Sequence, residues 1–213
     1  MKRTVGIVEA VFDSLYLLSA LTLGVLLLRG EGARQLAGVM ALVLAFGDAF
    51  HLLPRIQAIR TGRWAELRGA LGRGKEITSV TMTVFYLLLW QVGLLALRPA
   101  DVGGYTAALY ALAAVRIVLC LLPQNGWQTE KPSVGWGVAR NVPFLLQGGM
   151  VALLFERNWQ SVPGLRWMWL AIALSFGCYL PVVLWAHRRP ALGSLMLPKT
   201  CAYLWMLAMC LSL

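Results

Sequence analysis

Seven stretches of mainly apolar residues alternate with short polar segments along this chain of 213 residues. Each stretch is close to the roughly 20 residues with which an α-helix crosses the hydrocarbon core of a bilayer. The strands of a membrane barrel would instead alternate in polarity over about 10 residues, and no such alternation occurs. The pattern predicts an all-α fold, a polytopic membrane helix bundle in one domain, residues 1–213. The predicted transmembrane helices cover about 5–28, 35–54, 77–97, 104–122, 141–156, 166–186 and 193–213.

Basic residues gather on one side of the predicted membrane. The segment between the second and third spans carries six of them against a single acid, Glu66: Arg55, Arg60, Arg63, Arg68, Arg73 and Lys75. With Lys2, Arg3 and the basic residues of the other segments on that side, the total is twelve, against five on the opposite side. Short segments rich in Lys and Arg stay in the cytoplasm. The N-terminus is therefore predicted to be cytoplasmic.

The net charge of +10 and the hydrophobic content of 59% indicate which kinds of molecule the protein binds. A basic chain can bind nucleic acid, but here the charge follows the positive-inside pattern, and attraction to anionic lipid accounts for it. We expect a multi-pass protein of the cell membrane with membrane lipids and an amphiphilic small molecule as partners, and no nucleic acid. Glu9 and Asp13 interrupt the first span, which argues against a cleaved signal peptide. A homo-oligomer is left open.

Ionisable residues inside the spans mark candidate function, because burying them in a membrane is costly. Glu9 and Asp13 lie four residues apart near the start of the first span, and Asp48 precedes His51 by three residues late in the second. The later spans add further polar residues at the same predicted end of the bundle: Arg116, Arg140, Asn141, Lys199 and Tyr203. Their shared depth predicts a polar cavity that opens toward the cytoplasmic side.

These residue types suggest acid–base chemistry on an anionic ligand. A carboxyl group in a medium of low dielectric keeps its proton to higher pH and can act as a general acid. The catalytic candidates are Asp48, His51, Glu9 and Asp13. Arginine and lysine can hold a phosphate or carboxylate, so the candidates for substrate binding are Lys75, Arg116, Arg140, Asn141, Lys199 and Tyr203. The structural alternative is that Asp48 pairs with Arg116 or Arg140, and Glu9 or Asp13 with Lys199, to hold the helices together.

Two further motifs were weighed. Residues 69–75, GALGRGK, fit the glycine and lysine positions of a P-loop, but Glu76 follows where Ser or Thr is needed and no strand precedes, so nucleotide hydrolysis is not expected. A glycine-rich turn with Lys75 at a helix N-terminus could still receive a phosphate; the alternative is a flexible basic loop. The cysteines show no zinc-binding spacing, so no metal or cofactor is predicted, and the sequence does not decide whether a metal joins Asp48 and His51.

The run LAFGDAFHLLPR, residues 44–55, resembles a motif of the lysoplasmalogenase-like membrane family, in which a Gly-Asp pair lies late in a membrane helix. Gly47 and Asp48 match that pair. The chain end is also similar, with a basic turn and a last helix: His187, Arg188 and Arg189, then Cys201, Ala202 and Tyr203. The family usually has eight helices, and it has a second acid where this chain has Phe176, Gly177 and Cys178.

This resemblance implies hydrolysis of the vinyl ether bond of a lysophospholipid. The reaction needs a carboxylic acid that stays protonated near neutral pH, an anion to stabilise an oxocarbenium ion, and a water. Asp48 would be the acid or its partner, and Glu9 or Asp13 would replace the missing second acid. The phosphate would bind Arg116, Arg140 and Lys75. The alternative function is a small-molecule transporter or a ligand-binding seven-helix receptor, although the internal repeat typical of transporters is not visible.

Overall fold

The computed structural model of the protein describes residues 3–129, 133–186 and 188–213, and the regular elements there are all helices. Lys2, Lys131 and His187, which entered the predictions above, lie outside these residues. Seven helical segments of the described chain are long and apolar enough to cross a membrane, which confirms the predicted fold class. The α-helices are α1 Arg3–Leu28, α2 Gly32–Thr61, α3 Trp64–Leu97, α4 Gly103–Leu121, α5 Val134–Asn158, α6 Met168–Trp185 and α7 Met196–Met209.

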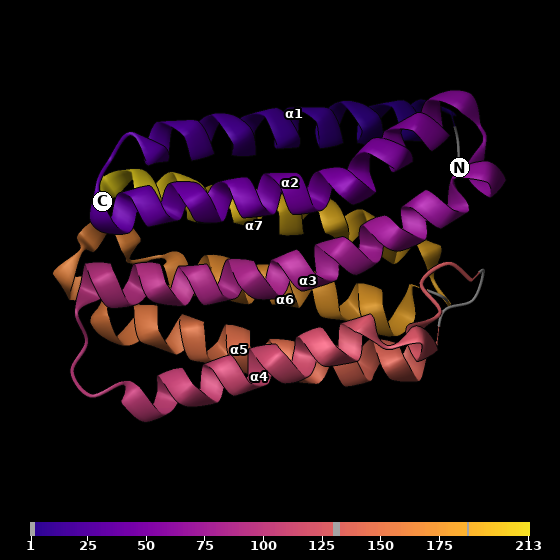
Figure 1. Ribbon diagram of the computed structural model, residues 1–213. Helices are drawn as coiled ribbons and strands as arrows, with labels where there is room; N and C mark the ends of the chain where they lie inside the picture. The colour runs from indigo at the N-terminus through magenta and orange to yellow at the C-terminus, as the bar shows by residue number, and fades with distance from the viewer. Residues whose placement is uncertain (1–2, 130–132, 187) are drawn as a thin grey trace.

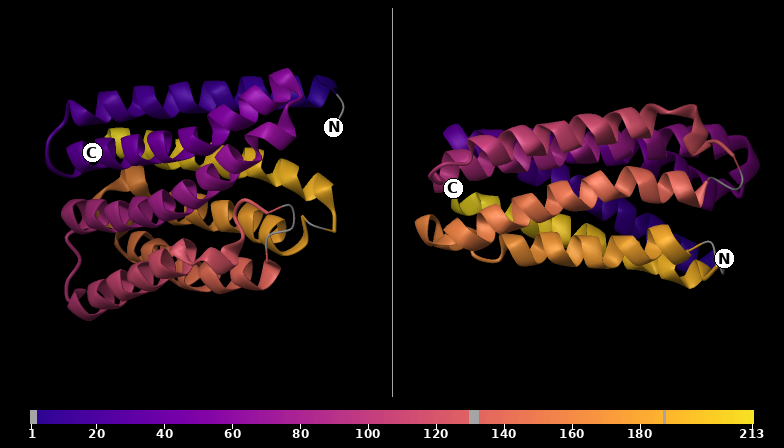
Figure 2. Two further views of the ribbon diagram at one scale, coloured as in Figure 1. Left: turned by 45° about the vertical axis from the view of Figure 1, so that its right-hand side comes forward. Right: turned by 90° about the horizontal axis from the view of Figure 1, so that it is seen from below.

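The seven helices form a ring in chain order. Each helix packs against the next, α7 closes the ring on α1, and α3 also contacts α5 (Figures 1 and 2). The most extensive of these contacts is between α2 and α3. The N-terminus lies at the same end of the bundle as the α2–α3 turn, and the C-terminus lies at the opposite end (Figure 1). This alternation agrees with seven crossings.

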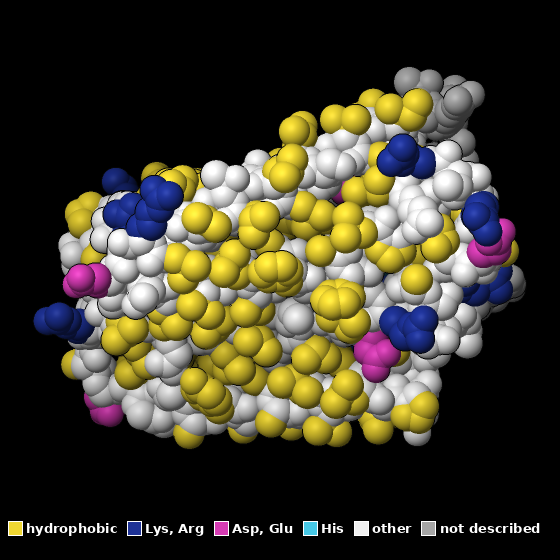
Figure 3. Space-filling model, turned by 45° about the horizontal axis from the view of Figure 1, so that its top comes forward, with side chains coloured by type: hydrophobic (Ala, Val, Ile, Leu, Met, Phe, Trp, Pro, Cys, Tyr) yellow, Lys and Arg dark blue, Asp and Glu magenta, His cyan; other side chains and the backbone are white. Residues whose placement is uncertain are grey.

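The surface carries the polarity expected of a membrane bundle. Hydrophobic side chains cover the middle of the face in Figure 3, while Lys, Arg, Asp and Glu side chains gather toward its two ends. Inside the bundle, aromatic rings from α3, α5, α6 and α7 pack edge to face or tilted, with centroids 4.9–6.3 Å apart. The members of this aromatic core are Phe85, Tyr86, Phe144, Phe176, Tyr179 and Tyr203.

The predicted ends of the second and third spans were wrong. Helix α2 has 30 residues and continues through Pro54, and α3 has 34 residues and begins at Trp64. At 1.5 Å per residue they are about 45 and 51 Å long, against about 30 Å for the hydrocarbon core. Proline removes only one backbone hydrogen bond, and a helix can extend from lipid into water. Five of the six basic residues therefore lie on helices, and only Arg63 lies in the turn between them.

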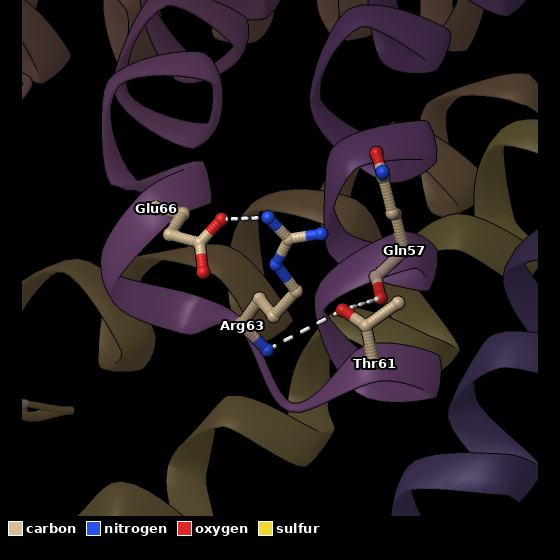
Figure 4. A network of polar contacts seen from close by, with 4 residues as sticks. All are labelled: Gln57, Thr61, Arg63 and Glu66. Carbon is tan, nitrogen blue, oxygen red and sulfur yellow. Dashed lines mark hydrogen bonds and ion pairs between the residues drawn. The ribbon is translucent and has the colours of Figure 1, made fainter.

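The turn between these extensions has two residues, Gly62 and Arg63. Gly62 has φ of 75° and donates its N–H to the Ala58 carbonyl, as glycine often does at a helix end. The Thr61 hydroxyl donates to the Gln57 carbonyl over 2.8 Å and accepts from the Arg63 backbone N–H over 3.3 Å (Figure 4). The Arg63 guanidinium pairs with Glu66, so the one acid of this segment is neutralised locally.

The glycine-rich turn predicted at residues 69–75 was also wrong, because this segment is helical within α3. Two of its three glycines, Gly72 and Gly74, serve close packing instead. A Cβ atom on Gly74 would collide with the carbonyl oxygen of Phe50, and one on Gly72 would collide with that of Trp127. In a regular helix the Phe50 carbonyl would accept a hydrogen bond from the N–H of residue 54. Pro54 has no N–H, so this bond is missing. The extensions of α2 and α3 can thus approach at backbone distance.

We expect Gly74→Ala to destabilise the protein. The added methyl group would force α2 and α3 apart, and overpacking of this kind costs about 1–3 kcal/mol. Gly69→Ala is the matched control, since it lies in the same helix with open space at its Cβ position. There, loss of glycine flexibility should stabilise the helix by about 0.5–1 kcal/mol. Thermal unfolding in detergent measures both; equal melting temperatures for the two variants would contradict this account of the packing.

The cytoplasmic location of the N-terminus stays a prediction, and it fixes the side on which the α2–α3 turn lies. We expect Arg63→Cys, in a background without other cysteines, to resist a membrane-impermeant thiol reagent added to intact cells. Ala100→Cys, exposed between α3 and α4 at the other end of the bundle, should react. The reverse pattern of labelling would invert the topology.

Candidate functional site

Asp48 lies at the junction of α1, α2 and α7. Its Oδ2 accepts a hydrogen bond of 2.6 Å from the Tyr16 hydroxyl of α1. The charge of Lys199, near the start of α7, interacts favourably with Asp48 without forming a direct ion pair. Tyr16 and Lys199 are both buried, with 2% and 9% of their surface exposed. Asp48 thus combines a direct bond from a hydroxyl donor with the field of a buried ammonium group, an environment in which a carboxyl group can take part in proton transfer.

Lys199 is surrounded by aromatic rings. Its Nζ lies 4.6 Å from the ring centroid of Tyr179 on α6 and 5.2 Å from that of Tyr203 on α7. Such cation–π contacts stabilise a desolvated ammonium group. The Tyr179 hydroxyl in turn donates to Asn141 Oδ1 of α5 over 3.0 Å, and the Asn141 amide donates to the Gly137 carbonyl over 2.7 Å. Lys199, Tyr203 and Asn141 are therefore parts of one layer of side chains.

Arg116 of α4 is the most deeply buried cation of this layer. Only 2% of its surface is exposed. Its Cζ lies 3.1 Å from the ring centroid of Phe144, and its charge also interacts with Tyr86 and Tyr179. Two of its three guanidinium nitrogens, Nε and Nη1, have no hydrogen-bond partner among the described residues. A buried charge without a counter-ion is costly, so this guanidinium is suited to receive an anion.

Arg140, unlike Arg116, forms a side-chain hydrogen bond that joins two segments of the protein. Its Nη1 donates to Asn125 Oδ1 over 2.8 Å, and its Cζ lies 4.1 Å from the ring centroid of Trp127. Asn125 is fully buried, and its amide donates to the carbonyls of Leu119 and Leu122 at the end of α4. Arg140 therefore fastens α5 to the segment after α4, and its hydrogen-bonding capacity is partly used.

The two carboxylates of α1, Glu9 and Asp13, differ in whether they have a partner. Glu9 forms an ion pair of 2.8 Å with Arg55 of α2. Asp13 is buried, with 6% of its surface exposed, and its Oδ2 has no hydrogen-bond partner among the described residues. Its charge interacts with those of Arg55, Glu9 and Asp48. The pairs of the structural alternative, which would join Asp48 to an arginine and Glu9 or Asp13 to Lys199, are not formed in the described chain.

His51 and Lys75 lie nearer the α2–α3 turn. His51 Nδ1 is buried without a partner, and its ring lies in the field of the Lys75, Arg55 and Lys199 charges. Lys75 has an exposed side chain and lies more than two turns after the start of α3, not at a helix N-terminus. It lines a cavity of about 290 Å³ together with Trp64, Arg68, Trp127 and Thr129. A surface cavity with two cations and two indole rings can accept an anionic group.

Part of the predicted set comes together in this layer. The Tyr16 hydroxyl bonds to Asp48, and Asp48 lies in the field of the Lys199 charge. Lys199 contacts the ring of Tyr179, which bonds to Asn141, so the layer links α1, α2, α7, α6 and α5. Lys75 is the predicted residue that lines the surface cavity of about 290 Å³. Aromatic rings fill the space around Arg116 and Lys199 instead.

Three further residues contribute to this layer and were not among the predicted site residues: Tyr16, Phe144 and Tyr179. Tyr16 follows Glu9 and Asp13 at helical spacing, seven and three residues later, so it shares their helix face. That spacing was a usable signal. Phe144 lies four residues after Arg140, but nothing in the sequence indicates that Arg116 of another helix would stack on its ring.

These observations define a class of protein: a seven-helix membrane bundle with a buried polar layer. In that layer the cations Arg116 and Lys199 form no ion pair among the described residues. Across residues 3–129, 133–186 and 188–213, no group of three or more His, Cys, Asp or Glu side chains is arranged to hold a metal ion. Comparison of the chain with protein-family models, curated proteins and solved structures finds no match. The similarity to the lysoplasmalogenase-like family stays a prediction.

Proposed function

We propose that the protein is a membrane-embedded enzyme that binds an anionic lipid or small amphiphile in the polar layer and hydrolyses its ether bond. The proposed substrate is a lysophospholipid with a vinyl ether. The observation that carries this proposal is the buried Arg116 guanidinium, whose Nε and Nη1 lack partners while Asp48 and Lys199 lie in the same layer. A phosphate would supply the missing counter-charge, and arginine binds phosphate well.

The proposed reaction breaks the bond between the ether oxygen and the alkenyl carbon. A carboxyl group gives its proton to the alkene carbon remote from the ether oxygen, and an oxocarbenium ion forms next to that oxygen. Water adds to the cationic carbon and returns a proton to the carboxylate. The resulting hemiacetal collapses to a fatty aldehyde and a glycerophospholipid alcohol. The two carboxylates would serve as proton donor and as the anion that stabilises the cation.

The contacts support Asp48 and Asp13 as these two carboxylates. Glu9 is occupied by its ion pair with Arg55, whereas Asp13 has an oxygen without a partner and interacts with the charge of Asp48. The Tyr16 hydroxyl would orient Asp48, and Lys199 would adjust its charge. We further propose that the layer faces the cytoplasmic side of the cell membrane, a location that the positive-inside rule supports.

The test is an aldehyde-release assay on the purified protein with a lysophospholipid that carries a vinyl ether. The matched saturated alkyl-ether lipid has the same head group but no alkene to protonate. Release of one aldehyde per vinyl-ether molecule consumed, and none from the saturated lipid, would support hydrolysis. Absence of aldehyde would refute it. If both lipids nevertheless raise the melting temperature, the alternative function follows, a transporter or receptor that binds through Arg116 without chemistry.

A further inference from the structure

A second feature of the bundle lies outside the polar layer, in a groove between α1 and the last two turns of α2. The groove has a volume of about 850 Å³. One wall is formed by α1 residues such as Ile7 and Val11, the other by Ile56 and Ile59 of α2. Figure 1 shows α2 changing direction in its second half, where Pro54 lies inside the helix, while α1 continues straight. The groove lies beside the part of α2 that follows Pro54.

The lining of the groove is mainly apolar, and its serine hydroxyl is bonded within its own helix. The Ser14 hydroxyl, one of the few polar groups in the lining, donates to the Ala10 carbonyl over 2.8 Å within α1. Ile7 and Val11 each expose more than half of their surface. In a bundle whose helices cross a membrane, such a groove opens to lipid. Its shape and polarity fit a hydrocarbon chain.

The end of the groove near the α2–α3 turn is different, because Arg60 and Trp64 line it. Arg60 forms no ion pair in the described chain, and the nearest acid in sequence, Glu66, already pairs with Arg63. Further arginines on the same helical extensions add to the positive charge. Tryptophan favours the membrane interface, and arginines near an anionic membrane surface are attracted to it.

We propose that this groove binds one anionic phospholipid, with an acyl chain against Ile7, Val11 and Ile59 and its phosphate at Arg60. Charge complementarity selects this occupant: a zwitterionic lipid offers the same chain but no net negative charge to a rim that holds an unpaired arginine. This site is separate from the polar layer and does not depend on the proposed hydrolysis.

The test is native mass spectrometry of the protein after reconstitution with equal amounts of phosphatidylglycerol and phosphatidylcholine. The wild type should retain one phosphatidylglycerol in preference to phosphatidylcholine. Arg60→Gln should remove that preference, and Ala10→Trp, which fills the groove, should lower retention of both lipids at least tenfold. The matched controls Arg157→Gln and Ala114→Trp, exposed on α5 and α4, should behave as the wild type.

Two results would overturn the proposal. Unchanged lipid selection in Arg60→Gln would show that the arginine at the groove end does not hold the head group. A wild-type dimer that dissociates in Ala10→Trp would show that a second copy of the chain occupies the groove. Because Arg60 is exposed, Arg60→Gln should fold even if Ala10→Trp does not, so the lipid preference remains measurable.

Discussion

Replacing Arg116 by methionine should raise the melting temperature of the lipid-free protein and abolish its stabilisation by a lysophospholipid. The guanidinium is 2% exposed and has two nitrogens without partners. Its burial costs on the order of several kcal/mol, whereas a methionine would keep its contact with the Phe144 ring. A gain of each kcal/mol corresponds to about 2–4 °C in a chain of this length. The charge that destabilises the empty protein is the one proposed to bind the phosphate.

The ligand arm of this experiment uses the saturated alkyl-ether lysophospholipid, which is not hydrolysed. At 100 times its dissociation constant, such a ligand should stabilise the wild type by about 2.7 kcal/mol and leave Arg116→Met unaffected. Arg157→Met is the control, since it removes an exposed arginine at the far end of α5. Equal stabilisation of Arg116→Met and wild type by the lipid would refute Arg116 as its binding group.

Hydropathy alone predicted the seven helices and their order, because the cost of exposing backbone polar groups to lipid leaves little choice of structure. It failed at the helix ends. Residues 55–76 are polar enough to read as a loop, yet they continue α2 and α3 as helices beyond the apolar core. Along this part of α3, Gly74 packs against the backbone of α2 at Phe50. A contact between two helices leaves no mark in the hydropathy of either one.

The sequence predicted the depth in the membrane at which the residues of the polar layer lie, but not which side chains pair with one another. Alternating helix direction placed Asp48, Arg116 and Lys199 at one level, and in the structure the charge of Lys199 interacts with those of Asp48 and Arg116. The partners were not predictable, because they depend on how each helix is rotated in the ring. The structural alternative paired Asp48 with an arginine, but Asp48 accepts its hydrogen bond from the hydroxyl of Tyr16, on the helix that packs against both α2 and α7.

Asp48→Asn should abolish turnover of the vinyl-ether lipid, with a loss of at least about 100-fold, the range that general acid–base catalysis contributes. The Asn oxygen can still accept from Tyr16, but the amide can neither give nor carry the proton. Removing one member of a buried ion pair costs about 3–5 kcal/mol. Asp48 and Lys199 make no direct ion pair, and Lys199 keeps its two aromatic neighbours, so a smaller loss of stability is expected.

The double variant Asp48→Asn, Lys199→Met separates catalysis from charge balance. It removes the ammonium group that Asp48→Asn leaves without a counter-charge, so its melting temperature should return to that of the wild type or exceed it. Turnover should remain absent if Asp48 handles the proton itself. If the double variant regains both stability and aldehyde release, Asp48 serves only to neutralise Lys199 and the catalytic role passes to Asp13. Asp13→Asn, measured in parallel by the same assay, should then be the variant that loses turnover.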